Sequence, residues 1–466
     1  MTDSAPSSAM QACIFVFFGI TGDLAQRKLL PALYHLFKDG QIHEESIILG
    51  ISRRDVTAEE LLSRVELCVN EVDNVCDPTA MHKIQRALRM HKMSLTDEEE
   101  YDELLTLLNS IEDEKAMCMS RLYYLSIPPQ MFEPIVSNLG QHGLNMTCPH
   151  GTAGSRLLVE KPFGYDLNSA KKLIAATGEW FGEDQLFRID HYTAKEAVQN
   201  ILAFRRSNPS VEELWNNGSI LSIEVTAYEE LGIEGRAVFY DKVGALRDFV
   251  QSHLLQLLAV ATMDLPASLD SNSVHEAKEN LFASILPVPV DQVSRTAQRG
   301  QYQGYREDAE NPESFTETYA SLTLQINNDR WQGIPMIVRT GKAMDHKTTE
   351  IKVKFAGSDG ISTHELVFDI LRSTICLKTD PETLVISEAL QTAVARFQVD
   401  HQPDYAKPIT DGYERVLLDA ISGDHMVFTT SREILYSWKI IENVLSEWSQ
   451  SSNDLIVYPK SSQSIG

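Results

Sequence analysis

CIFVFFGITGDLAQRK, residues 13–28, joins an apolar run to a turn that contains two glycines. The run CIFVFFG is almost continuously apolar, which is typical of a parallel strand buried on both faces. Gly19 ends this run and Gly22 lies three residues later, and the residues after them have helical spacing. A strand, a glycine turn and a helix in this order predict a dinucleotide-binding unit, whose pyrophosphate lies against the N–H groups at the helix start.

The glycine pattern departs from the usual GxGxxG. Gly19 and Gly22 match its second and third glycines, but Phe17 holds the first position. A glycine pair after a strand also occurs in ordinary tight turns, so this stretch alone leaves both interpretations open. The residues expected to contact a cofactor here are Gly19, Thr21, Gly22, Asp23 and Leu24.

Apolar strands continue to alternate with amphipathic helices through the first half of the chain. Strands are expected at 46–52, 121–127 and 156–162, and helices at 23–40, 57–72, 96–114, 130–143 and 167–181. This alternation predicts an α/β domain of the doubly wound, Rossmann-like type.

The second half changes character. A long, mostly apolar helix is expected at 245–263 and an amphipathic one at 431–448. Strands are expected at 222–230, 317–327, 335–341, 350–357, 365–371 and 374–380. Because most of them follow one another with short connections, we predict an α+β domain with a large, mostly antiparallel sheet packed with helices. The predicted domains are 1–189 and 190–466.

The end of the second strand bears on the choice of dinucleotide. NAD-binding domains usually carry an acidic residue there, which holds the ribose hydroxyls. ILGISRRD places Arg53 and Arg54 at this point instead, and an arginine suits the 2′-phosphate of NADP. NADP is therefore favoured over NAD, with Arg53 as a cofactor contact. The alternative is that both arginines pair with the acidic surface, including Asp55.

Composition excludes several classes of partner. The 466 residues carry a formal net charge of −25, which disfavours nucleic acid and anionic membranes, since both need a basic surface. No apolar run approaches the roughly 20 residues of a membrane span, and no secretory signal is apparent. The six cysteines are scattered without metal-ligand or disulfide-framework spacing, so we expect no metal and a reducing compartment, the cytoplasm.

In so acidic a chain, a bound phosphate needs a local cluster of cations. RIDHYTAKE, residues 188–196, is such a cluster. If it is helical, His191 and Lys195 share a face, while Asp190 points about 100° away from His191. A solvated, charged helix face is the alternative that these nine residues leave open.

Several stretches together resemble one family. FFGITGDLAQRKLLPALYHLF, ILGISRR, VEKPFGYDL, FRIDHYTAKEAVQN, GRAVFYDKVGALRDFVQSHLLQ and PMIVRTGKAM occur in the order typical of glucose-6-phosphate dehydrogenases. The resemblance runs from about residue 13 to 440. It implies oxidation of glucose 6-phosphate to 6-phosphogluconolactone with hydride transfer to NADP, the first step of the pentose phosphate pathway.

The same resemblance implies three catalytic residues. The proton acceptor must be mostly unprotonated near pH 7, which favours a histidine, and the family places it at His253. Asp190 would be its carboxylate partner, which fixes the tautomer and stabilises the cation. Lys161, in VEKPFG, would lie between nicotinamide and sugar. From the residues alone, His253 is equally well a structural polar group on an apolar helix.

The resemblance also implies the substrate contacts. His191, Tyr192 and Lys195 would hold the phosphate, Glu229 and Asp248 the sugar hydroxyls, and Lys342 and Lys347 would close over the substrate; simple surface lysines are the alternative for the last two. On an ideal α-helix Asp248 and His253 are about 140° apart. We therefore expect them to meet one substrate only if Asp248 lies at a frayed helix start.

Two other functions compete with this one. A broader hexose 6-phosphate or free-sugar dehydrogenase would accept other sugars comparably, and a silent NADP-binding or scaffold protein would bind cofactor without turnover. The phosphate residues argue against the first, and the retained Lys161, Asp190 and His253 against the second. A homodimer or homotetramer through the C-terminal sheet domain is expected from the resemblance.

Overall fold

The computed structural model describes residues 11–73, 75–146, 154–357, 363–379, 385–400 and 412–465. The chain forms two compact units. The first unit contains Met1–Phe163, Lys171–Ala194 and Ile409–Ser431, and the second contains Gly164–Ala170, Lys195–Pro408 and Arg432–Gly466. The chain therefore passes between the units several times, whereas the sequence suggested a single division at residue 190.

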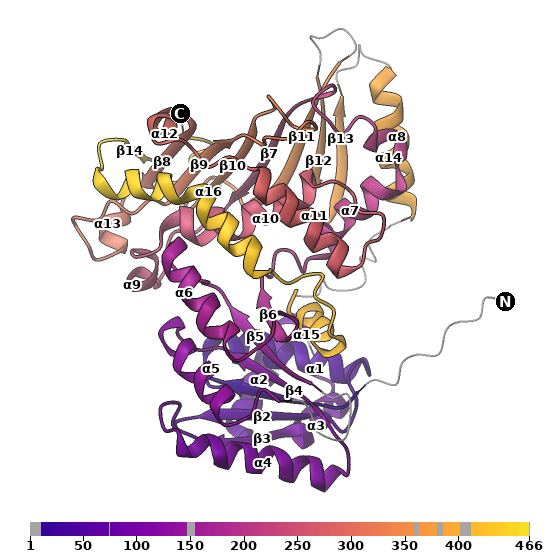
Figure 1. The fold of residues 1–466 in the computed structure, drawn as a ribbon, viewed down its shortest axis with the longest axis vertical. Helices are drawn as coiled ribbons and strands as arrows, with labels where there is room; N and C mark the ends of the chain where they lie inside the picture. Colours follow the sequence, from indigo (N-terminus) through magenta and orange to yellow (C-terminus); the bar gives the residue numbers. More distant parts are fainter. Residues whose placement is uncertain are drawn as a thin grey trace, which may run out of the picture. The chain divides into compact units, whose positions relative to one another are not determined.

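The first unit is built on a six-stranded sheet with the order β3-β2-β1-β4-β5-β6 (Figure 1). All neighbouring strands in it are parallel. This is the strand order of dinucleotide-binding domains, so the predicted fold class of the first domain is confirmed. The strands are β1 (Cys13–Phe18), β2 (Ile47–Ser52), β3 (Leu88–Lys92), β4 (Ser120–Leu125), β5 (Ser155–Glu160) and β6 (Leu186–Ile189).

Helices accompany this sheet, and the expected ones are present. They are η1 (Ala25–Leu29), α1 (Leu30–Lys38), α2 (Ala58–Asp73), α3 (Pro78–Ala87), α4 (Glu99–Lys115), α5 (Phe132–Gln141), α6 (Leu167–Gly178) and α15 (Gly412–Ser422). The helix expected over 23–40 is divided, with a π-helical segment, η1, before α1; Pro31 lies in the first turn of α1.

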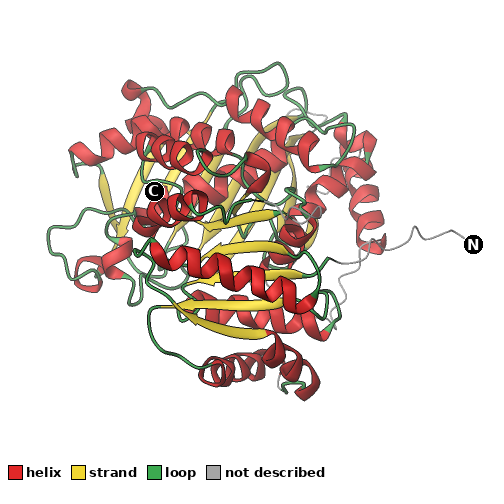
Figure 2. Ribbon diagram, turned by 60° about the horizontal axis from the view of Figure 1, so that its bottom comes forward, coloured by secondary structure: helices red, strands yellow, loops and turns green. Residues whose placement is uncertain are grey.

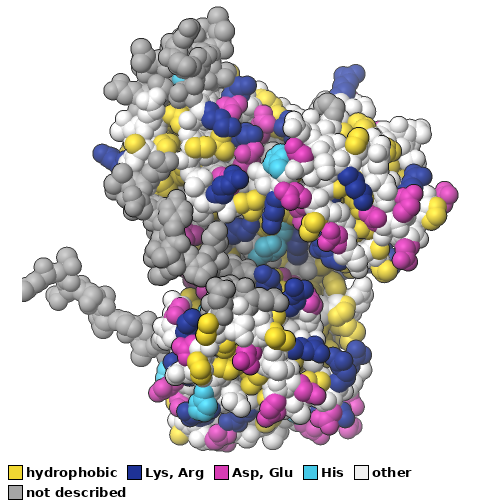
Figure 3. All heavy atoms as spheres, turned by 180° about the vertical axis from the view of Figure 1, so that it is seen from behind, with side chains coloured by type: hydrophobic (Ala, Val, Ile, Leu, Met, Phe, Trp, Pro, Cys, Tyr) yellow, Lys and Arg dark blue, Asp and Glu magenta, His cyan; other side chains and the backbone are white. Residues whose placement is uncertain are grey.

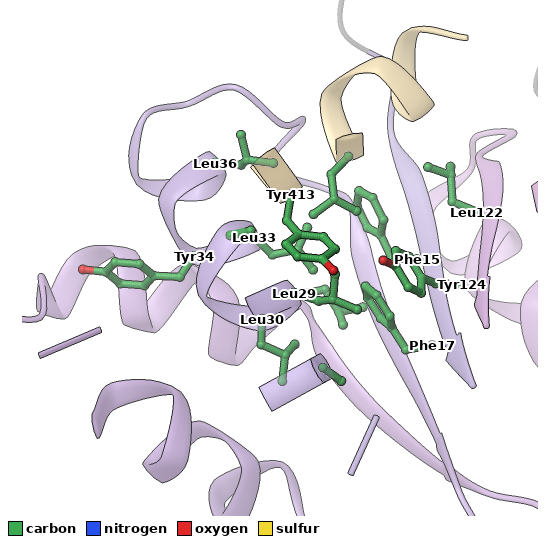
Figure 4. Packing of buried hydrophobic residues seen from close by; sticks show 14 of the residues in the cluster. Phe15, Phe17, Leu29, Leu30, Leu33, Tyr34, Leu36, Leu122, Tyr124 and Tyr413 are labelled. Atoms are coloured by element: carbon green, nitrogen blue, oxygen red, sulfur yellow. The ribbon is translucent and has the colours of Figure 1, made fainter. Parts of the chain in front are cut away.

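The core of this unit explains the apolar opening of the chain. Every residue of β1 is buried, because both faces of the strand are covered. On one face Phe15 and Phe17 join a cluster with Leu29 and Leu33 from the helix that follows. Tyr413 enters the same cluster from α15, nearly 400 residues later in the chain (Figure 4). Phe17, at the first glycine position of the usual motif, is thus a core residue.

The second unit contains an eight-stranded sheet with the order β13-β12-β11-β7-β10-β9-β8-β14. Its pairings are antiparallel except β7 with β10 and β8 with β14, which confirms a mostly antiparallel sheet. The strands are β7 (Ile220–Tyr228), β8 (Ala297–Tyr302), β9 (Tyr319–Leu324), β10 (Met336–Gly341), β11 (Thr348–Ala356), β12 (Thr363–Asp369), β13 (Thr374–Thr379) and β14 (Leu455–Tyr458).

Helices pack against this sheet (Figure 2). The longer ones are α7 (Glu196–Ser207), η4 (Leu246–Leu254), α10 (Leu255–Thr262), α11 (Ser271–Ser284), α14 (Val385–Asp400) and α16 (Ser431–Gln450). Short ones are α8 (Pro209–Glu212), α9 (Ala237–Tyr240), α12 (Val293–Thr296) and α13 (Tyr305–Asp308). α7 contacts β12. η4 and α10 contact the central strands, so this continuous helix is buried, as its apolar composition predicted.

The surface reflects the composition. On the face in Figure 3, basic side chains are interspersed with acidic ones. None of the helices in the described residues has the length and hydropathy that crossing a bilayer requires. Cys13, Cys68, Cys76 and Cys376 are free thiols, while Cys118 is disulfide-bonded, which the scattered cysteine spacing did not predict.

His364 on β12 offers a test of the core. Its side chain is fully buried, and neither ring nitrogen has a hydrogen-bond partner among the described residues. An unsatisfied buried polar group costs about 1–3 kcal/mol. We expect His364→Leu to raise the free energy of unfolding by about that amount, measured by urea denaturation. His82→Leu, at an exposed position on α3, is the control and should change little; a less stable His364→Leu would contradict the prediction.

Candidate active site

The glycine turn lies where β1 ends. Gly19 has φ +89°, and a Cβ there would lie 2.4 Å from the carbonyl oxygen of Ser126, so this position requires glycine. The Gly22 N–H donates to the Gly19 carbonyl at 2.8 Å, and the helix begins at Asp23. The side chain of Asp23 is exposed, while Thr21 and Leu24 are half-buried. The turn thus presents a helix N-terminus at the carboxyl end of a parallel strand.

The side chain of Gln26 is hydrogen-bonded to this turn, a role that the sequence analysis did not predict. Its buried amide donates from Nε2 to the Thr21 carbonyl at 2.7 Å, and its Oε1 accepts from Arg64 at 2.8 Å. The relay links α2 to the turn. In the sequence, Gln26 could have been recognised as the one polar residue among the buried positions of an otherwise apolar helix face.

Gln26→Leu should therefore loosen the turn. We expect a rise of about tenfold in KM for the dinucleotide, which corresponds to one buried hydrogen bond, with KM for the second substrate unchanged. Initial-rate kinetics with each substrate varied in turn would measure both. Gln41→Leu, at an exposed position, is the matched control. A change in both KM values, or in neither, would argue against this role for Gln26.

Arg53 and Arg54 directly follow β2 and are both exposed. The Arg54 N–H donates to Ser52 Oγ at 3.1 Å, which turns the chain at the strand end. Within the described part of the chain, neither guanidinium forms an ion pair with Asp55. The two cations therefore lie at the carboxyl edge of the strand next to β1, where a dinucleotide's adenosine ribose would be held.

The carboxyl end of β5 carries Glu160 and Lys161, and the Lys161–Pro162 peptide is cis. Glu160 accepts a hydrogen bond from the Tyr124 hydroxyl at 2.5 Å. Burial raises the pKa of the Glu160 carboxyl to about 7, although hydrogen bonds from Tyr124 and Tyr413 and the charge of Lys161 oppose the shift. The sequence analysis had singled out Lys161 and had missed Glu160.

The segment RIDHYTAKE is not a helix, which corrects the conditional expectation above. It spans the end of β6, a turn over 191–194 and the start of α7. Lys195 is the extended residue that precedes α7, with φ −68° and ψ 135°, so His191 and Lys195 do not share a helical face. They even belong to different compact units.

Hydrogen bonds hold the turn. The Tyr192 N–H donates to Asp190 Oδ1 at 2.9 Å. The Thr193 hydroxyl is within hydrogen-bonding distance of the Asp190 carbonyl (2.8 Å) and the Val427 carbonyl (2.6 Å). Thr193 thereby ties the turn to the returning segment 412–431. Asp190 itself is buried.

Aromatic rings surround His191. Its imidazole stacks on the Tyr413 ring with centroids 6.4 Å apart and an interplanar angle of 15°, and it lies 5.0 Å from the ring of Tyr192. A Cβ on Gly412 would approach the His191 carbonyl to 3.1 Å. The turn is therefore packed closely against the start of α15, a contact that no local pattern could reveal.

His253 lies on η4, and this segment is π-helical from Leu246 to Leu254. A π-helix bonds residue i to residue i+5 and has about 4.4 residues per turn, so residues five apart are only about 50° apart around the helix axis. The separation of about 140° that we expected for Asp248 and His253 applies to an α-helix and is wrong here. Asp248 is not at a frayed end either, because the helix begins at Gly244. Asp248 and His253 are five residues apart, so the π-helical register places them closer together around the axis than an α-helix would.

A second cluster lies at the adjacent ends of β7 and β10. The Glu229 N–H donates to the Gly341 carbonyl at 2.9 Å, and the Lys342 ammonium is paired with the Glu229 carboxylate. Lys342 is buried, with Nζ 5.1 Å from the centroid of the Tyr240 ring. Burial raises the pKa of Tyr240 well above its ordinary range, and the carboxylates of Asp248 and Glu229 add to this shift.

The second unit thus brings Glu229, Lys342 and Asp248 together around Tyr240. Lys347 differs from them: it is exposed, and its backbone N–H donates to Glu230 at 3.2 Å. Among the described residues no group of His, Cys, Asp and Glu is placed to hold a metal ion.

A six-stranded parallel sheet with a glycine turn at β1 defines a dinucleotide-binding protein, and a buried histidine with an acid on the same helical segment suits proton abstraction from a polar substrate. The class is therefore that of the NAD(P)-linked dehydrogenases. Residues 16–200 match the family described as glucose-6-phosphate dehydrogenase, NAD binding domain, and residues 202–464 match its C-terminal domain. The chain belongs to the glucose-6-phosphate dehydrogenase family.

Relatives of similar length agree. The glucose-6-phosphate 1-dehydrogenase of Bacillus subtilis (strain 168) is 34% identical over 461 residues, which cover 93% of this chain and 91% of that protein. That of Chlamydia muridarum is 34% identical over 476 residues, covering 95% and 91%. A solved glucose-6-phosphate dehydrogenase in complex with its substrate glucose-6-phosphate superposes with a TM-score of 0.83 at 29% identity, covering 98% of this chain and 97% of that one.

Proposed function

We propose that this protein oxidises glucose 6-phosphate to 6-phosphogluconolactone with NADP as hydride acceptor, the first step of the pentose phosphate pathway. The observation that carries the proposal is membership of the family over nearly the whole chain together with a buried histidine on the RDFVQSHLLQ helix. The first unit would hold the dinucleotide and the second most of the sugar.

The cofactor assignment rests on two features of the first unit. The Gly19–Gly22 turn with Thr21, Asp23 and Leu24 would hold the pyrophosphate at the helix N-terminus. Arg53, exposed at the end of β2 where an NAD-binding domain would carry an acid, would pair with the 2′-phosphate. Bound NADP supplies the hydride acceptor.

The chemistry of the chain itself concerns one proton. The sugar's anomeric C–H bond breaks as hydride leaves, and its hydroxyl proton passes to the imidazole of His253. Asp190 would orient that imidazole and stabilise the imidazolium. Lys161, at the end of β5, would contact both sugar and cofactor. Its ammonium would stabilise the negative charge that develops on the sugar oxygen as the proton leaves.

The remaining residues would fix the sugar. His191, Tyr192 and Lys195 would bind the phosphate, with Lys195 contributing a charge-assisted bond. Glu229 and Asp248 would accept hydrogen bonds from hydroxyls. The Lys342–Glu229 pair holds one of these acids in place, and Lys347 would close over the substrate from an exposed position.

Initial rates with NADP or NAD, and with glucose 6-phosphate, galactose 6-phosphate or free glucose, would test the proposal. We expect turnover with NADP and glucose 6-phosphate. Equal rates with NAD would remove the role given to Arg53. Comparable rates with the other sugars would favour the broader dehydrogenase, and no turnover with any pair would favour a silent NADP-binding protein.

We also propose a cytoplasmic homodimer or homotetramer that assembles through the second unit. An eight-stranded sheet with β13 and β14 at its edges leaves backbone groups available for association, and Ile456 and Val457 on β14 are partly exposed. Light scattering coupled to size-exclusion chromatography would give the oligomeric state, and a monomer would refute the proposal.

A further inference from the structure

The π-helical segment η4 needs an explanation of its own. π-helices are rare, occur mostly as single turns and are frequent at functional sites. Here the π-helical stretch covers Leu246–Leu254 and contains both Asp248 and His253. If it relaxed to an α-helix, these two side chains would move to about 140° apart. Contacts with other elements must therefore stabilise the π-helical register of Leu246–Leu254 over the α-helical one.

Glu317 holds the beginning of the segment. Its carboxylate accepts from the buried Leu246 N–H at 2.9 Å, and its backbone carbonyl accepts from the Ala245 N–H at 3.0 Å. Gly244 has φ +72°, and a Cβ there would lie 2.4 Å from Glu317 Oε1. Glu317 lies just before β9 and caps the start of the helix. Its carboxylate fits there because position 244 is a glycine.

Gln251 holds the middle. Its buried amide donates from Nε2 to Ser437 Oγ at 2.7 Å, on α16. The Ser437 hydroxyl donates in turn to the Ile434 carbonyl at 2.9 Å, so its lone pair is directed at Gln251. This bond lies two residues before His253 and connects η4 to a helix nearly 200 residues away in sequence.

Gln256 holds the end, three residues after His253. Its Nε2 donates to Glu433 Oε2 at 2.8 Å, and its Oε1 accepts from Lys278 at 3.1 Å. Lys278 and His275 of α11 also bind the Glu433 carboxylate, at 3.0 and 2.9 Å. All four side chains are buried, and their hydrogen bonds tie α10, α11 and α16 together.

We propose that Glu317, Gln251 and Gln256 are positioning residues that hold η4 in its π-helical register and thereby set Asp248 and His253 towards one substrate. The inference rests on the proposed function, because it assigns the register to the reaction. The three contacts fall before, between and after the two functional side chains. Because each contact joins the helix of η4 and α10 to another element, we expect the effect on the reaction to act through the placement of Asp248 and His253.

Two variants test the contacts at the start and the middle. Gln251→Leu keeps the side chain's size and removes the bond to Ser437. Glu317→Leu removes the acceptor for Leu246, whereas Glu317→Gln retains an oxygen acceptor and should rescue activity. Asn208→Leu is the matched control, since Asn208 is a buried amide in the same unit that donates to the Phe204 carbonyl at 2.8 Å.

The first readout is steady-state kinetics with glucose 6-phosphate and NADP. We expect Gln251→Leu and Glu317→Leu to lower kcat about 10- to 100-fold with KM for the sugar phosphate changed less than about threefold, as misplacement of a catalytic group predicts. Glu317→Gln should stay within about threefold of the wild type, and so should Asn208→Leu. A loss of kcat in Asn208→Leu equal to that in Gln251→Leu would overturn the proposal. Should Glu317→Leu fail to fold, Ser437→Ala replaces it and should lower kcat as Gln251→Leu does.

The second readout does not depend on turnover. Amide hydrogen exchange of the peptide covering 246–254 should accelerate in Gln251→Leu and remain slow in Asn208→Leu. Unchanged exchange in Gln251→Leu would overturn the positioning role even if wild-type turnover is high. Absent turnover in the wild type would instead remove the proposed function, while the exchange result would still decide whether these residues hold η4.

Discussion

His253→Asn is expected to lower kcat by about 10²–10⁴-fold, because a positioned general base contributes that much and asparagine cannot accept the proton. KM for glucose 6-phosphate should change less than about threefold, since the imidazole is needed for the transition state and not for holding the phosphate. Asparagine is close to histidine in shape, so the burial of this position on η4 is largely retained. Steady-state kinetics with saturating NADP would measure both constants.

The pH profile separates this role from a structural one. A neutral imidazole is required in the free enzyme, so kcat/KM of the wild type should fall towards acidic pH as the base is protonated. That fall should be lost in His253→Asn. His82→Asn, on the exposed surface of α3, is the control and should behave as the wild type. A kcat within tenfold of the wild type would show that His253 is not the base.

Lys195→Ala is expected to raise KM for glucose 6-phosphate by about 10- to 150-fold, the equivalent of the 1.5–3 kcal/mol that a hydrogen bond to a charged group contributes. kcat should change little, because the phosphate contact is made equally in the ground state and the transition state. Lys195 is half-buried at the start of α7, so its ammonium is less screened than that of a surface lysine.

A matched comparison identifies the phosphate as the group that Lys195 binds. Lys171→Ala, at an exposed position on α6, should leave KM unchanged. Any slow oxidation of free glucose should be unaffected by Lys195→Ala, because the lost interaction is with the phosphate alone. An unchanged KM for glucose 6-phosphate, or an equal rise for free glucose, would refute this role.

Two strands that the sequence analysis missed, β3 and β8, lack the apolar run that marks a strand. β3 (Leu88–Lys92) is an edge strand with three half-buried residues, so it shows no apolar run. β8 (Ala297–Tyr302) buries Arg299, whose guanidinium pairs with Asp454 and donates to the Trp448 carbonyl. A charged residue in a strand centre conceals the strand until its partner, 155 residues later, is known.

The sequence alone determined the class of fold, and its resemblance to one family supplied most of the residues that we propose for the reaction. Local physics suffices for the fold class: β1 is apolar because both of its faces are buried, and Gly19 is glycine because a Cβ would collide with Ser126. Repeated parallel connections, which need helices between them, predict the parallel sheet. The order of its strands came from the structure.

Only the tertiary structure decided the geometry of the candidate site. RIDHYTAKE became a turn and not a helix, because Thr193 and His191 are bonded to and packed against the distant segment 412–431. The helix with His253 became π-helical, and Glu317, Gln251 and Gln256 bind it from other elements. Spacing along the sequence predicts only the α-helical alternative, since the bonds that select between two backbone registers come from residues far away in the chain.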